Sequence, residues 1–77
     1  MNRIMYGRLI RNGVLVGYCS YIDENGKRVE IISPPYGKLE VYINGKKVEP
    51  TEEHVMIWTM VASWLGEEEI IKKLKVK

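Results

Sequence analysis

The sequence predicts an α+β fold in which an antiparallel β-meander of four or five strands is packed against a C-terminal helix. Two observations carry this prediction. Three Asn-Gly pairs, at positions 12–13, 25–26 and 44–45, divide the first fifty residues into β-prone runs, and Asn-Gly between such runs is a strong hairpin signal. The last third of the chain begins with Pro50-Thr51-Glu52-Glu53 and continues with closely spaced apolar residues, as helices do.

The turn types define where the strands begin and end. Asn12-Gly13 and Asn44-Gly45 suit two-residue type I′ loops, whose central residues both need positive φ, and Asp23-Glu24-Asn25-Gly26 suits a type I turn closed by a glycine bulge. Two prolines in Ser33-Pro34-Pro35-Tyr36-Gly37-Lys38 remove ladder donors and end the third strand. The predicted strands are 3–11, 14–22, 27–32, 39–43 and 46–49.

Pairing the strands from these turns gives the sheet two different faces. The first face is apolar, with Ile10 opposite Leu15, Tyr6 opposite Cys19, Ile4 opposite Tyr21, Tyr21 opposite Val29, Cys19 opposite Ile31, and Leu39, Val41, Ile43 and Val48 together in the last hairpin. The second face of the first two strands mixes Met5, Leu9, Val14, Val16, Tyr18 and Ile22 with charged residues. Both faces of these strands are therefore expected to be covered, either by a strongly curled, barrel-like sheet or by a second chain.

A helix is predicted over 52–65. Thr51 can cap the free backbone N–H groups of its first turn, and acidic Glu52 and Glu53 lie where the helix dipole favours negative charge. Gly66 is expected to end or kink the helix, with a short helical extension over about 67–75. No linker separates these elements, so residues 1–77 are expected to form one domain.

Composition and charge disfavour several classes of protein, namely strongly basic nucleic-acid binders, secreted proteins and membrane proteins. The 12 basic and 10 acidic residues give a net charge of +2, which attracts nucleic acid or anionic lipid only weakly. The N-terminal run lacks a signal-peptide core, and the longest apolar window is shorter than the roughly 18 residues of a membrane helix. A cytoplasmic protein without a membrane partner is expected. The absence of Gln and the abundance of Ile, Lys and Glu favour a heat-adapted source, whereas three Asn-Gly pairs argue against one.

The chain offers few residues for catalysis. One cysteine, Cys19, and one histidine, His54, are too few for a disulfide or a tetrahedral zinc site. Cys19 falls on the core face of a central strand, where burial raises a thiol pKa, and His54 is expected at the surface or the core boundary. The consecutive carboxylates of 67–69 fan around the helix and cannot converge on one metal ion. We therefore expect no catalytic residue, no metal and no cofactor, and a protein that is not an enzyme.

A nucleic-acid contact is one of two functional hypotheses. The predicted register places Arg3, Arg11 and Arg28 on one sheet face with Tyr18, which supplies cations for phosphates and a ring for stacking. The order of five strands and a C-terminal helix also resembles that of the small chromatin proteins of thermophilic archaea, whose lysine-rich composition is missing here. Glu30 on the same face weighs against this hypothesis, which therefore ranks second.

The turn at Pro34, Pro35 and Tyr36 is a second candidate surface. Two prolines hold this turn rigid, and a tyrosine supplies contact area at little entropic cost. Two interpretations remain open at this point. The turn is either an exposed recognition loop for a protein partner or a connector whose Tyr36 lies on the helix.

The first functional hypothesis is a small non-enzymatic interaction module that forms a homodimer. A domain of this size buries only about 60% of the surface that its unfolded chain exposes, so partner chains often supply the rest. The segment HVMIWTMVASWL, residues 54–65, has more apolar side chains than one side of a small sheet can cover. The predicted interface comprises Met56, Met60, Trp64, Ile70, Ile71 and Leu74.

Overall fold

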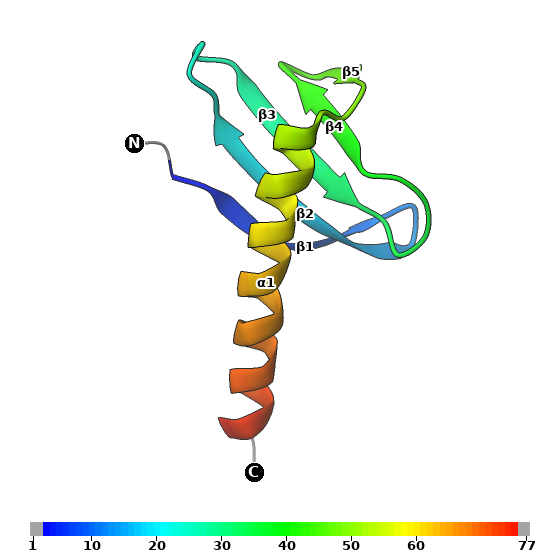
Figure 1. Cartoon of the computed structure of the whole chain (residues 1–77). Helices are drawn as coiled ribbons and strands as arrows, with labels where there is room; N and C mark the ends of the chain where they lie inside the picture. The colour runs from blue at the N-terminus through cyan, green and yellow to red at the C-terminus, as the bar shows by residue number, and fades with distance from the viewer. Residues whose placement is uncertain (1–2, 76–77) are drawn as a thin grey trace.

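The computed structural model describes residues 3–75 and consists of five strands followed by one helix (Figure 1). The elements are β1 (Met5–Arg11), β2 (Val14–Ile22), β3 (Arg28–Ser33), β4 (Glu40–Ile43), β5 (Lys46–Val48) and α1 (Glu52–Lys75). The strands form one antiparallel sheet in the order β1-β2-β3-β4-β5, and α1 packs on one face of it. The predicted α+β meander is confirmed, and every strand begins and ends within two residues of its predicted bounds.

The turns have the backbone conformations that their sequences predict. Asn12 and Gly13 have φ of 53° and 78°, and Asn44 and Gly45 have φ of 51° and 84°. Both pairs therefore have the two positive φ values of a type I′ hairpin. In the β2–β3 turn, the Asp23 carboxylate accepts hydrogen bonds from the backbone N–H groups of residues 25 and 27, which fixes the chain reversal.

The main core lies between the sheet and the first half of α1. The ladder pairs Tyr6 with Cys19 and Cys19 with Ile31, as predicted, while Ile4 precedes β1 and lies outside the ladder. The buried apolar residues are Cys19, Val29, Ile31, Val41, Val61 and Leu65. Three of the four connections between neighbouring strands of the sheet are short turns, so local turns bring the core residues of different strands together.

The start of α1 is capped by Thr51, as predicted. The Thr51 hydroxyl oxygen accepts the backbone N–H of His54 at 3.3 Å, and the backbone N–H of Thr51 donates to His54 Nδ1 at 3.1 Å. This is the reciprocal arrangement of a capping box, with histidine in the position usually held by Glu or Gln. His54 is 9% exposed, so it lies at the core boundary, where its ring accepts the Thr51 backbone N–H and its own backbone N–H donates to the Thr51 hydroxyl.

The prediction that Gly66 ends or kinks the helix is wrong, because α1 continues from Glu52 to Lys75. A glycine inside a helix costs only about 1 kcal/mol relative to alanine. Contacts between β1 and the residues just after Gly66 hold the helix on its course. The second half of α1 therefore runs beyond the edge of the sheet, and the molecule reaches 45 Å in its longest dimension (Figure 1).

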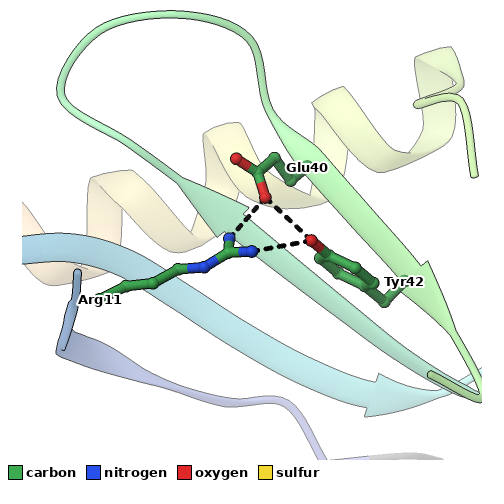
Figure 2. A network of polar contacts seen from close by, with 3 residues as sticks. All are labelled: Arg11, Glu40 and Tyr42. Carbon is green, nitrogen blue, oxygen red and sulfur yellow. Dashed lines mark hydrogen bonds and ion pairs between the residues drawn. The ribbon is translucent and has the colours of Figure 1, made fainter. Parts of the chain in front are cut away.

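The face of the sheet that points away from α1 is also partly buried. Val16 is 4% exposed and Ser20 is 6% exposed on this face. Arg11, at the end of β1, contacts Glu40 and Tyr42 of β4, although two strands lie between them (Figure 2). Neighbouring strands are about 4.8 Å apart, and β1 and β4 are three such spacings apart in the sheet. Their side chains can meet across that distance only where the sheet curls inward. The sheet is therefore curled but does not close into a barrel, and it covers only part of this face, because Met5, Val14 and Ile22 remain exposed.

Candidate functional site

One side of α1 carries a row of apolar side chains that are exposed except at Trp64, which is half-buried against Tyr6 of β1. We call Met56, Met60, Trp64, Ile70, Ile71 and Leu74 the helix flank. Exposure is 71% at Met56, 60% at Ile70 and 74% at Leu74. The opposite side of the same helix supplies the buried Val61 and Leu65. The helix is therefore apolar on two sides, and only one of them is used within the chain.

The second half of α1 is held against β1 by polar and aromatic contacts. The Tyr6 hydroxyl donates a hydrogen bond to the Glu68 carboxylate, and Arg8 pairs with Glu69 through Nε at 2.6 Å and Nη2 at 3.2 Å. The rings of Tyr6 and Trp64 lie 5.5 Å apart. The Arg8 guanidinium lowers the pKa of the Glu69 carboxyl, so this pair is ionised at neutral pH. These contacts fix the direction in which the helix flank leaves the sheet.

A polar network closes one end of the curled face (Figure 2). Arg11 donates to the Glu40 carboxylate and, at 2.9 Å, to the Tyr42 hydroxyl, which in turn donates to Glu40 at 3.0 Å. The hydrogen bonds from Arg11 and Tyr42 lower the pKa of the Glu40 carboxyl. Each of the three side chains is bonded to the other two, so the arrangement is that of a structural clasp.

The structure does not bring the predicted nucleic-acid contacts together. Arg11 is paired with Glu40, while the Tyr18 hydroxyl donates to Glu30 at 2.9 Å and Arg28 lies 3.7 Å from the same carboxylate. Arg11 and Arg28 pair with opposite ends of the nine-residue strand β2, about 27 Å apart at the rise of a β-strand. Arg3 is exposed and precedes β1. The face therefore has carboxylates beside its cations and no continuous basic surface across these residues.

The proline turn borders a shallow groove of about 350 Å³ beside the Arg11 clasp. Its lining includes Val14, Val16, Pro34, Pro35 and Tyr36. Tyr36 is 90% exposed, so it does not lie on the helix. Of the two interpretations of this turn, the exposed loop agrees with the structure and the connector packed on the helix does not.

Cys19 has the properties predicted for a buried thiol. It is fully buried in the core, and burial raises its pKa to about 11. A thiol in this state is a poor nucleophile at neutral pH. Within residues 3–75, no group of three or more His, Cys, Asp or Glu side chains is placed to hold a metal ion. Over the same residues, α1 does not combine the length and apolar character of a membrane-spanning helix.

Three contacts between distant segments are not predicted by the sequence. Tyr6 and Glu68 are 62 residues apart, Arg8 and Glu69 are 61 apart, and Arg11 and Glu40 are 29 apart. No local pattern signals pairs so distant. The first two pairs follow only from knowing that α1 crosses the sheet and continues past β1, and the third follows only from knowing that the sheet curls.

Comparisons with known proteins give no assignment, because no family model, curated protein or solved structure matches the chain.

Proposed function

We propose that this protein is a small non-enzymatic interaction module that self-associates through the helix flank. The observation that carries the proposal is the exposure of five large apolar side chains along one side of a helix whose other side already packs on the sheet. Exposed groups of large apolar side chains on a soluble protein mark interaction sites, and here they lie on both sides of the polar Ser63 and Glu67.

The binding partner that suits the helix flank is a second copy of the same chain. A two-fold axis places the helix flank of one chain against the helix flank of the other, so the two copies cover each other. Methionine is flexible and fills irregular gaps, which suits the contribution of Met56 and Met60 to such a contact. A different protein could bind the same surface, and the test below distinguishes that case from self-association.

No specific observation favours the nucleic-acid hypothesis over this one. The arginines of the sheet face are separated, and two of them have carboxylate partners. Self-association is therefore the function that the surface supports best.

The test compares two glutamate substitutions in the same helix. Met60→Glu places a charge on the helix flank, whereas Ala62→Glu places the same charge at an exposed position about 160° away around the helix. Sedimentation equilibrium should show that Met60→Glu shifts the protein to monomers, while Ala62→Glu associates like the unmodified chain. Circular dichroism checks that both variants keep the fold.

Equal association of the two variants would contradict the helix flank as the contact. If the unmodified protein is a monomer, self-association is contradicted, and the helix flank would then be a binding surface for a different protein.

A further inference from the structure

We infer that two copies of α1 pair antiparallel, as a short two-stranded coiled coil centred between Ser63 and Glu67. This inference rests on the proposed self-association and adds its geometry. It predicts which residues meet across the two-fold axis.

The exposed side of α1 has coiled-coil spacing. The positions Met56, Met60, Ser63, Glu67, Ile70 and Leu74 follow one another at intervals of four and three residues, and all six are exposed. We call these six residues the seam. Alternating intervals of three and four keep side chains on one stripe of a helix over several turns, as the a and d positions of a heptad do. Trp64 and Ile71, also in the helix flank, directly follow seam positions and border the stripe.

The polar residues in the middle of the seam decide the direction of pairing. In a parallel pair each seam residue faces its own copy, which sets the Glu67 carboxylates of the two chains against each other. Like charges at such a contact are destabilising. In an antiparallel pair, Glu67 instead faces Ser63 of the partner subunit, whose hydroxyl can donate a hydrogen bond to the carboxylate. The same arrangement sets Met60 against the partner's Ile70 and Met56 against the partner's Leu74.

Gly66 supports a helix crossing at this point. A Cβ added at Gly66 would meet nothing within 4 Å, so packing within the chain gives no reason for glycine here. Glycine in the middle of a helix is nonetheless unfavourable. In the antiparallel arrangement, Gly66 borders the centre of the seam and lies close to the partner's Gly66. The missing side chains allow the two backbones to approach each other there.

The overall shape accommodates this pairing. The sheet covers the first half of α1, and the second half extends past β1 (Figure 1). The side of α1 away from the seam carries Val61 and Leu65, which are buried in the core. Antiparallel pairing lays the extended half of each helix along the sheet-supported half of the other. The two sheets then lie on the outer sides of the helix pair, and Ile70 and Leu74 gain a partner that their own chain does not supply.

Disulfide trapping tests the direction of pairing. In the double variant Met56→Cys with Leu74→Cys, the two thiols of one helix are about 27 Å apart, because 18 residues rise 1.5 Å each. A disulfide needs Cα atoms closer than about 7 Å, so it cannot form within one helix. Mild oxidation followed by peptide mass spectrometry should find residue 56 linked to residue 74. The unmodified protein, whose Cys19 is buried, is the blank.

The other outcomes separate this inference from the proposed function. A dimeric protein that links 56 to 56 and 74 to 74 keeps self-association and overturns the antiparallel arrangement. A dimeric protein that forms none of these links overturns the seam as the contact. A double variant and an unmodified protein that are both monomeric at the same concentration overturn the proposed function.

A second variant tests the crossing point without cysteines. Gly66→Ala improves helix propensity and meets no atom in its own chain, so the isolated fold should gain stability. Self-association should nevertheless weaken about tenfold, which corresponds to about 1.4 kcal/mol. Unchanged or stronger association of Gly66→Ala would overturn a close crossing at this residue.

Discussion

The indole ring of Trp58 lies directly against the backbone of Gly17, on the face of the sheet that α1 covers. A Cβ added at residue 17 would be 2.6 Å from the Cζ2 and Cη2 atoms of the Trp58 ring, which is closer than real Cβ contacts occur. Glycine at this position is therefore what allows the tryptophan ring to pack between the helix and the sheet.

We expect Gly17→Ala to destabilise the protein by about 1–3 kcal/mol, the usual cost of overpacking a core. Urea unfolding followed by circular dichroism measures this change. Gly7→Ala is the matched control, because Gly7 is also in a strand and a Cβ there meets nothing within 4 Å. Equal midpoints for the two variants would show that the ring moves aside freely.

We expect Thr51→Ala to lower the free energy of unfolding by about 1 kcal/mol, since the cap of α1 is lost. The substitution also removes the hydroxyl that contacts His54 Nδ1 at 3.2 Å. Thr51→Ser keeps the hydroxyl and should retain most of the stability. Thermal or urea midpoints that are the same for alanine and serine at this position would argue against the side-chain cap.

We expect acid to weaken the clasp at Glu40. Its pKa is lowered from the ordinary value of 4.5 in the folded state, chiefly by the Arg11 hydrogen bond and then by that of Tyr42. A carboxyl with a lowered pKa stabilises the fold above its unfolded-state pKa, and this contribution is lost as pH falls through the folded-state value. Stability should therefore fall below about pH 4.5.

The Glu40→Gln variant should show a smaller loss of stability over the same pH range. Urea midpoints measured between pH 3 and pH 7 give the comparison. Glu24→Gln, which removes a carboxylate from the exposed β2–β3 turn, should follow the unmodified protein. Identical pH profiles for all three proteins would show that the clasp does not contribute.

We expect Cys19 to resist alkylation at neutral pH. Its thiol is fully buried and its pKa is raised to about 11, so little thiolate is present or accessible. Iodoacetamide labelling at pH 7.5 should be slow in buffer and fast in denaturing urea. Rapid labelling of the folded protein would show that the core around β2 opens readily.

The sequence predicted the sheet well because its information is local. Asn12-Gly13 and Asn44-Gly45 define hairpins by their own backbone preferences, and strand register follows from each turn. The predicted cap at Thr51 is local in the same sense. These features depend on residues within a few positions of one another.

The rest of the architecture depends on contacts between distant segments. Gly66 favours a helix end when only its neighbours are considered, yet Glu68 and Glu69 reach Tyr6 and Arg8 of β1 and hold α1 on course. The partner of Arg11 was equally unpredictable, because Glu40 comes within reach only once the sheet curls. Tertiary contacts thus outweighed local preference at these positions.

The most direct test of the proposed self-association is the solution mass of the unmodified protein, measured by sedimentation equilibrium over a wide range of concentrations. One chain has a mass of 9.0 kDa. Self-association through the helix flank predicts twice that mass at high concentration, falling toward the mass of one chain on dilution. A mass of 9.0 kDa at every concentration would show that the protein does not self-associate.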